Sequence, residues 1–340
     1  MSAQAPRVSV VMSVYNGQEH LREAVDSVLG QTFTDFEFLI VDDGSTDHTL
    51  EILRSYDDAR IRLIVQENRG LVDSLNRALE EAKSEYVARM DADDVSLPER
   101  FSSQIAFLDA HPEVGILGTA VVYIDRGGEV VGSWHVPTLP GEIGWQLFFG
   151  TCLAHPSVMM RRELVLELGS YDGDALYAED YDLWARAVSL AGLANLDSEL
   201  LQRRAWEESV THRHTEIQEQ TVREILRSLI ERRLSVAISS EDAVSLRLFA
   251  TERVAGDLTR IKQVAALIPR MCRAYVERVE LDAEEKNAVR MDAARKLYQL
   301  SATARPCSRL TASSIALRGA RLDPRPLRVL AGRGARRAIF

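Results

Sequence analysis

Cysteine is scarce in this chain, with only Cys152, Cys272 and Cys307 among 340 residues. The number is odd and the three residues lie far apart, which excludes a disulfide framework and a cysteine-rich zinc site. Such a chain suits a reducing compartment, and we expect a cytoplasmic protein.

Long apolar runs are also missing. No stretch approaches the roughly 18 consecutive apolar residues that a membrane-spanning helix needs. The apolar segment at 8–14 lacks a cleavage site and leads directly into the turn Tyr15-Asn16-Gly17, so we expect a strand there and not a signal peptide. The sequence therefore predicts a protein that does not span a membrane.

Two glycine-rich phosphate-binding motifs are absent as well. The loop after the first apolar segment has no G-x-G-x-x-G, and G-x-x-x-x-G-K-[ST] does not occur. These absences exclude a P-loop and argue against a plain dinucleotide site. The formal net charge of −10, with no basic stripe in the first 200 residues, argues against binding to nucleic acid.

What the chain does have is a regular alternation of strand-like and helix-like segments over its first 125 residues. Its 46% hydrophobic and 27% charged residues are ordinary for a globular protein. Apolar runs predict strands at 8–14, 36–41, 61–65, 85–90 and 114–122. Amphipathic stripes predict helices between them. This repetition predicts an α/β fold, with a mostly parallel, Rossmann-like sheet flanked by helices.

Polar residues follow four of these strands at their carboxyl ends. They occur at Ser13–Asn16, Asp42–Asp43, Asn68–Gly70 and Asp91–Asp93. Ligands of open α/β sheets bind at this edge, so a nucleotide could find partners there for its base, its ribose and its diphosphate. Asp42 alone is better interpreted as a cap of the turn that follows its strand.

The run Asp91-Ala92-Asp93-Asp94 places three carboxylates within four residues. Carboxylates so close repel one another unless a cation lies among them, and hard oxygen ligands suit Mg²⁺ or Mn²⁺. The alternative is a solvated acidic turn without an ion. The neighbouring polar strand ends favour a divalent ion that completes its shell with substrate phosphates.

Five segments, in this order, resemble the nucleotide-sugar domain of family 2 glycosyltransferases. They are VSVVMSVYN at 8–16, LIVDDGSTD at 39–47, NRG at 68–70, DADD at 91–94 and AEDYDLW at 178–184. The resemblance covers about residues 7–212. It implies a GT-A fold, a nucleoside-diphosphate sugar donor and transfer with inversion at the anomeric carbon. We accordingly expect a GT-A domain over 1–215, a helical region over 216–304 and a basic tail over 305–340.

The resemblance also implies a set of donor-binding residues along the strand ends. The set is Ser13, Val14, Tyr15, Asp43, Asn68, Gly70, Asp91, Ala92 and Asp93. Within it, the first three would line the nucleobase, and Asp43 would accept a hydrogen bond from a ring nitrogen. Asp91 would lie near the ribose, and Asp93 would bind Mn²⁺ or Mg²⁺. The donor would be a UDP-, GDP- or dTDP-sugar.

Inversion in one displacement needs a carboxylate that takes the proton of the acceptor hydroxyl. The resemblance assigns this role to Asp180, ahead of Glu179 and Asp182, although a helix cap is the alternative for an acid at this position. The ordinary pKa of a carboxyl group would leave Asp180 ionised at pH 7 without tuning. His155 and Trp184 are further acceptor-side candidates, as is Glu179, and His155 can equally stabilise a turn.

One segment departs from the family pattern. The family shows Tyr-Arg-x-His after its base, whereas this chain keeps Arg204 and has Trp206 in place of the histidine. Either His212 or His214 replaces that histidine, or the metal dependence is weaker. Residues 126–153 are expected to be a loop that selects the sugar and the acceptor.

The C-terminal part differs in composition. Charged helical patterns run from about Glu216 to Leu300, and Gly256 and Pro269 are expected to interrupt them. The last 36 residues hold nine arginines and one acid, Asp323, a local charge of +8. This tail is expected either to touch anionic lipid at the inner face of the membrane or to stay solvated. The resemblance implies a sugar or lipid-linked acceptor, as in cell-surface polysaccharide synthesis.

Two other functions are compatible with an α/β sheet and metal-binding acids. A sugar nucleotidyltransferase would carry a glycine-rich loop with Arg and Lys after the first strand, and the loop YNGQE at 15–19 is not of this kind. A nucleotide-sugar-binding protein without catalysis is the second alternative. The presence of Asp43, Asp91, Asp93 and Asp180 argues against a loss of catalysis.

Overall fold

The computed structural model describes residues 5–205 and 215–323 of the chain. The chain divides into two compact units, residues 1–225 and 226–340. Helix α9 (Thr215–Leu234) contributes to both units. The domain boundaries expected from the sequence, at 215/216 and 304/305, stay predictions. In the described ranges, no helix is both long enough and apolar enough to cross a membrane.

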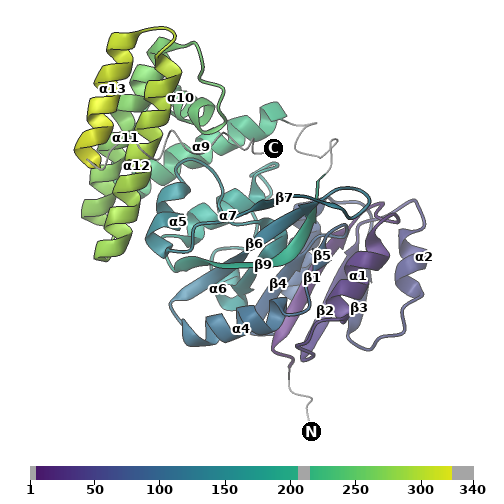
Figure 1. Cartoon of the computed structure of the whole chain (residues 1–340). Helices are drawn as coiled ribbons and strands as arrows, with labels where there is room; N and C mark the ends of the chain where they lie inside the picture. Colours follow the sequence, from purple (N-terminus) through teal and green to yellow (C-terminus); the bar gives the residue numbers. More distant parts are fainter. Residues whose placement is uncertain (1–4, 206–214, 324–340) are drawn as a thin grey trace. The chain divides into compact units, whose positions relative to one another are not determined.

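The first four strands form a parallel group, since a helix links each strand to the next. They are β1 (Val8–Val14), β2 (Phe36–Asp42), β3 (Ile61–Val65) and β4 (Tyr86–Met90). Strand β1 pairs with β2 and β4, and β2 pairs with β3. Their carboxyl ends therefore lie along one edge of the sheet (Figure 1). The predicted bounds of all four strands agree with the structure to within one residue.

The rest of the sheet is mixed. Its strands are β5 (Val95–Ser96), β6 (Val114–Ile124), β7 (Val130–Trp134), β8 (Met159–Arg161) and β9 (Gly192–Arg204). The strand order is β3-β2-β1-β4-β8-β6-β9-β5, with β7 paired to β6. Strand β8 runs antiparallel to both of its neighbours, while β9 is parallel to β6. The predicted α/β fold is confirmed. The sequence pattern did not indicate the antiparallel pairing of β8 with β4 and β6, or of β7 with β6.

The helices of the first unit bury apolar stripes in its core. They are α1 (Leu21–Leu29), α2 (Thr49–Arg54), α3 (Leu71–Glu81), α4 (Arg100–Ala110), α5 (Pro140–Gln146), α6 (Arg162–Glu167) and α7 (Glu179–Ala187). In α1, Leu21, Ala24, Val25 and Val28 are buried with the strands, because the 3.6-residue period puts them on one side.

The segment 126–153 is not the plain loop that we expected. It contains β7 and α5, and Ile143 and Trp145 of α5 are fully buried. Both elements are short, so neither offers enough residues for an apolar period to be recognised in the sequence.

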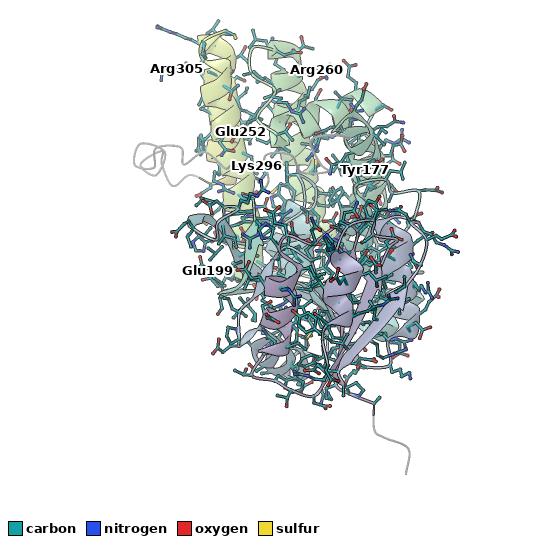
Figure 2. All side chains as sticks on the ribbon, turned by 90° about the vertical axis from the view of Figure 1, so that its right-hand side faces the viewer. Tyr177, Glu199, Glu252, Arg260, Lys296 and Arg305 are labelled. Carbon is teal, nitrogen blue, oxygen red and sulfur yellow. The ribbon has the colours of Figure 1, made fainter. Side chains whose placement is uncertain are left out.

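The second unit is helical, as expected. After α9 it contains α10 (Ser240–Ala250), α11 (Leu258–Arg278), α12 (Ala283–Ala304) and α13 (Arg309–Leu322). Gly256 separates α10 from α11 with φ of 85°, but Pro269 lies inside α11, so the interruption expected at Pro269 is wrong. Within α12, buried Asp292 accepts a 2.6 Å hydrogen bond from Lys296 Nζ. Figure 2 labels Lys296 among the side chains of the chain.

Candidate functional site

Asn16 ties the loop after β1 to the loop after β2. Its backbone N–H donates to Ser45 Oγ (2.9 Å), and its side-chain oxygen accepts from the Thr46 N–H (2.8 Å). Asn16 has φ of 53°, a left-handed conformation that asparagine adopts more readily than most residues. These bonds fix the segment predicted to line a base, in which Val14 is buried and Tyr15 is about half exposed.

Asp43 holds the loop after β3 in place. Its Oδ1 accepts from Gln66 Nε2 (2.8 Å) and from the Arg69 N–H (2.9 Å), and its Oδ2 accepts from the Gly70 N–H (2.8 Å). A carboxylate oxygen can accept two bonds, so Oδ2 has room for one more donor. Asp43 is buried, and it organises the loop that contains exposed Asn68 while its Oδ2 keeps one acceptor position.

The same two loops approach so closely at Gly44 that a larger residue would not fit. Gly44 has φ of +76°, and a Cβ there would lie 2.7 Å from the Asn68 nitrogen. Asp42 accepts from the Ser45 N–H at 3.2 Å, which supports the capping interpretation of that residue. The ends of β2 and β3 therefore present one packed set of loops.

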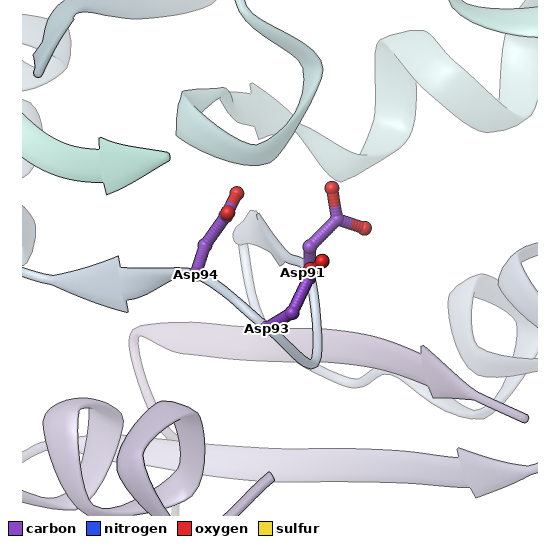
Figure 3. A group of neighbouring side chains, drawn as sticks. All are labelled: Asp91, Asp93 and Asp94. Atoms are coloured by element: carbon purple, nitrogen blue, oxygen red, sulfur yellow. The ribbon is translucent and has the colours of Figure 1, made fainter. Parts of the chain in front are cut away.

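The acid cluster consists of Asp91, Asp93 and Asp94, just after β4 (Figure 3). One ligand atom from each lies within 4.8 Å of the other two. Asp94 is buried, and among the described residues its Oδ2 has no hydrogen-bond partner. Burial and the charges of Asp91 and Asp93 raise the pKa of the Asp94 carboxyl well above its ordinary value. Repelling carboxylates around an unpartnered buried oxygen fit a divalent cation.

Arg204, the last residue of β9, stabilises the loop that contains the acid cluster. Its N–H donates to Asp94 Oδ1 (2.8 Å), and its Nε donates to the Asp93 carbonyl (3.0 Å). Its Nη1 donates to the Asp125 carbonyl (2.8 Å), and its Nη2 pairs with Glu23 at 2.7 Å. A residue 110 positions away in the sequence thereby fixes the backbone of the acid cluster.

Arg89 is a residue of this region that the sequence patterns did not single out. It lies in β4 with only 3% of its surface exposed, and its Nη1 lies 2.5 Å from Asp91 Oδ2. Among the described residues its Nε is buried without a hydrogen-bond partner. The signal was present in the sequence, since a charged residue inside an otherwise apolar buried strand needs a partner.

Glu179 and Asp180 open α7 and form a pair of partly buried carboxylates. Burial, together with the charge of Asp180, raises the pKa of Glu179 to about 7. Burial also raises the pKa of Asp180, while the 2.6 Å hydrogen bond from the Tyr181 N–H and the charge of Arg89 oppose the rise. The expectation of an ordinary, untuned Asp180 is therefore wrong, because the sequence could not show how far this helix end is buried.

His155 lies in a short 3₁₀ turn, η1 (His155–Ser157), and is almost fully buried. Its Nε2 shares a 2.8 Å hydrogen bond with the Tyr171 hydroxyl, and burial with the charge of Arg89 lowers the pKa of His155 well below 6.5. Trp184 packs edge-on against the imidazole at 6.0 Å between ring centroids and is fully buried. Trp184 is therefore part of the buried packing around His155.

The described residues bring most of the predicted site to one region. The acid cluster follows β4, and the charges of Arg89 and Asp91 both act on Glu179. The predicted roles of the individual residues stay predictions. Trp206, His212 and His214, which bear on the departure from the family pattern, lie outside the described residues.

Comparisons with known proteins agree with this geometry. The sequence model of glycosyl transferase family 2 matches residues 9–169. The chain is 35% identical over 211 residues to an amylovoran biosynthesis glycosyltransferase, AmsE, of Erwinia amylovora, covering 60% of this chain and 79% of that protein. It is 38% identical over 187 residues to a putative glycosyltransferase, EpsE, of Bacillus subtilis, covering 53% of this chain and 66% of that protein, slightly under two thirds. An O-antigen biosynthesis glycosyltransferase, WbnJ, of Escherichia coli is 32% identical, with 54% and 72% covered.

Solved structures show the same fold at low sequence identity. S. aureus TarS 1–349 in complex with UDP-GlcNAc superposes with a TM-score of 0.55 at 19% identity, covering 93% of this chain and 89% of that one. The mannosyltransferase PcManGT of Pyrobaculum calidifontis, in complex with GDP-Man and Mn²⁺, gives 0.51 at 18% identity, covering 94% and 86%. These likenesses support the GT-A arrangement of the first unit.

Proposed function

This chain belongs to glycosyl transferase family 2, and we propose that it works as an inverting glycosyltransferase with a nucleoside-diphosphate sugar as its donor. One observation carries the proposal. Three carboxylates lie within 4.8 Å of one another at the carboxyl edge of a parallel sheet, and the buried Oδ2 of Asp94 has no partner among the described residues. That edge is where α/β proteins bind nucleotides.

On the donor side, the packed loops would hold the nucleoside. Ser13, Val14 and Tyr15 would lie along the base, and the remaining acceptor position of Asp43 would take a hydrogen bond from it. Asp91, held by Arg89, would face the ribose. The relatives that bind UDP-GlcNAc and GDP-Man support a nucleotide-sugar donor in general, without naming the base or the sugar.

Asp93 would hold a Mn²⁺ or Mg²⁺ ion, with the unpartnered Oδ2 of Asp94 as the next oxygen of the cluster. A bound divalent ion would supply charge neutralisation for the leaving diphosphate. Arg204 keeps the loop backbone in position for this role, because it donates hydrogen bonds to both the Asp93 carbonyl and Asp94 Oδ1.

Asp180 would take the proton in the transfer step. The acceptor hydroxyl oxygen bonds to the anomeric carbon while the bond from that carbon to the diphosphate breaks. The hydroxyl proton passes to the Asp180 carboxylate, and the bonding electron pair leaves with the diphosphate. Attack opposite the leaving group inverts the anomeric centre. Glu179 and neutral His155 would then shape the acceptor side.

The acceptor would be a sugar or a lipid-linked sugar in cell-surface polysaccharide or glycoconjugate synthesis, since AmsE and WbnJ are named for amylovoran and O-antigen biosynthesis. The protein would act in the cytoplasm, with its basic tail (305–340) at the inner face of the membrane. The domains would be the GT-A unit (1–215), the helical region (216–304) and this tail. Neither a sugar nucleotidyltransferase nor a silent binding protein is favoured by the relatives.

A donor screen tests the proposal. Wild-type protein and Asp93→Ala are incubated with UDP-, GDP- and dTDP-sugars, with and without Mn²⁺, and release of the nucleoside diphosphate is measured. We expect release from one class of donor with Mn²⁺ and its loss in Asp93→Ala. Asp57→Ala is the matched control, an exposed aspartate in the segment between α2 and β3. Absence of any nucleotide binding, by thermal shift, would overturn the proposal.

A further inference from the structure

Helix α13 presents apolar side chains to the outside of the helical unit. Leu310 is 86% exposed and Leu317 is 64% exposed. Together with Ser314 and Arg321 they recur at i, i+4, i+7 and i+11, which places the four residues along one side of the helix. We call this set the α13 face. The helix is anchored by other positions, such as buried Ile315. Two exposed leucines on one side of a short helix leave apolar surface that a partner can cover.

Two cations lie next to the α13 face. Lys262 of α11 and Arg318 of α13 line, with Leu310, a pocket of about 300 Å³. Arg318 Nη1 donates to the Ala265 carbonyl (3.1 Å), which fixes the guanidinium at the pocket. In the described ranges, neither cation lies within 4.0 Å of a carboxylate. Ser314 adds a hydroxyl to the lining, so the pocket offers donors to an anion.

The distribution of charge along the chain indicates which anionic partner fits the pocket and the α13 face. Residues 305–340 carry +8, so the other 304 residues carry −18 to give the total of −10. Within these, residues 226–304 carry +3 and residues 1–225 carry −21. An anionic surface therefore repels the first 225 residues and attracts the C-terminal part, most strongly the segment that contains α13. Each Lys or Arg near an anionic leaflet strengthens binding about fivefold, and exposed leucines add the burial of apolar surface.

We propose that the α13 face and the pocket beside it dock on an anionic phospholipid surface. Leu310 and Leu317 enter the interface, and Lys262 and Arg318 contact the phosphate of a headgroup. The inference rests on the membrane contact proposed above for residues 305–340 and specifies the surface that makes it. It does not depend on glycosyl transfer. It assigns the contact to a folded, amphipathic surface and not to the arginines of the tail alone.

Flotation of the full chain with vesicles tests this assignment. The vesicles contain phosphatidylglycerol and phosphatidylcholine in equal parts, with pure phosphatidylcholine as the neutral comparison. The variants are Leu310→Gln with Leu317→Gln, and Lys262→Gln with Arg318→Gln. Leu190→Gln is the matched control, because Leu190 is 62% exposed but lies in the first unit. All substituted side chains are solvent-accessible or polar, so the fold is expected to persist.

We expect wild type and Leu190→Gln to bind anionic vesicles alone. The double leucine variant should bind at least about tenfold more weakly, because burying one leucine changes a partition constant by about that factor. The double cation variant should lose about tenfold or more. Equal binding of wild type and the leucine variant would overturn the inference. The contact would then depend on the basic residues alone.

Two further outcomes would also overturn it. Absence of vesicle binding by wild type would remove the tail contact as well. Self-association in solution that the leucine substitutions abolish would make the face an interface between copies of this chain. Release of the nucleoside diphosphate, measured in parallel without vesicles, should be the same in every variant, so a failure of the proposed glycosyl transfer would be seen separately.

Discussion

Arg89 and Asp91 form a 2.5 Å ion pair across the end of β4. The guanidinium is buried, and its charge also acts on His155, Glu179 and Asp180. One cation thus connects the acids predicted to hold the donor with the acids predicted to receive the proton. This relationship suggests that Arg89 sets the charge balance of the whole site.

Replacing Arg89 by Met should remove the positive charge that pairs with Asp91 and acts on Glu179 and Asp180. We expect turnover to fall about 10²-fold, since electrostatic groups of an active site contribute on this scale. The pKa of Asp180 should rise when the nearby positive charge is lost, so activity should need a higher pH. Arg89→Lys, which keeps the charge, should preserve the pH profile better. Identical pH profiles for wild type and Arg89→Met would contradict this role.

The acid pair predicts a pH dependence. A base must be deprotonated, and both Glu179 and Asp180 have raised pKa values, that of Glu179 to about 7. Activity should therefore rise with pH as this carboxyl pair deprotonates. Glu179→Gln removes a neighbouring negative charge, so the pKa of Asp180 should fall and the rise should move to lower pH. Rate–pH profiles of wild type and Glu179→Gln check the direction, and a shift to higher pH would count against it.

Gly44 offers a test of the donor loops. Ala at Gly44 would be strained by a positive φ and would also meet the Asn68 nitrogen at 2.7 Å. Gly128 is the matched control, because its φ is +90° but no atom lies within 4 Å of its missing Cβ. We expect Gly44→Ala to be less stable than Gly128→Ala by about 1–3 kcal/mol and to bind donor more weakly. Denaturant unfolding and donor titration check both effects; equal behaviour of the two variants would refute the close packing.

Asp292 should stabilise the helical unit. It accepts from Lys296 at 2.6 Å and also pairs with Arg295, and it is buried. Burial raises its pKa, but the charges of Lys296 and Arg295 outweigh this effect, so the folded-state pKa is lowered. Stability from this group is therefore present above the unfolded pKa of 3.8 and is lost as pH falls through the folded value.

Removing the carboxylate breaks the ion pairs of Asp292 with buried Lys296 and with Arg295. We expect Asp292→Ala to lower the free energy of unfolding by about 3–5 kcal/mol at neutral pH. Exposed Glu277→Ala on α11 serves as the control and should change stability by less than about 0.5 kcal/mol. Urea unfolding checks both values, and a neutral Asp292→Ala would show that the ion pair contributes no net stability.

The sequence predicted the regular parts of the fold well. Strands Val8–Val14 and Ile61–Val65 were found at their predicted bounds. The first is a largely apolar run between two turns, which is typical of a buried strand, whereas the second is only partly buried. Helix α5 was not predicted, since its few residues carry no recognisable period. Pro269 was predicted to break a helix that in fact continues through it, so packing of that helix outweighs the local preference.

For the site, the sequence supplied residue types and their order but not their surroundings. The acids after β4 could be named in advance, because three carboxylates within four residues repel one another unless a cation lies among them. The raised pKa values of Glu179 and Asp180 could not, because they come from burial at the start of α7. Arg204 was noted only as a kept motif residue, and its bonds to Asp93 and Asp94 depend on the pairing of β9.

A single variant can separate donor binding from proton removal, because donor affinity and turnover are measured independently. Asp180→Asn keeps the size of the side chain but cannot take a proton, so donor affinity in the presence of Mn²⁺ should match that of wild type. Transfer to an acceptor should fall about 10²–10⁴-fold at every pH. Loss of donor affinity in step with turnover, or turnover close to that of wild type, would contradict Asp180 as the base of this glycosyltransferase.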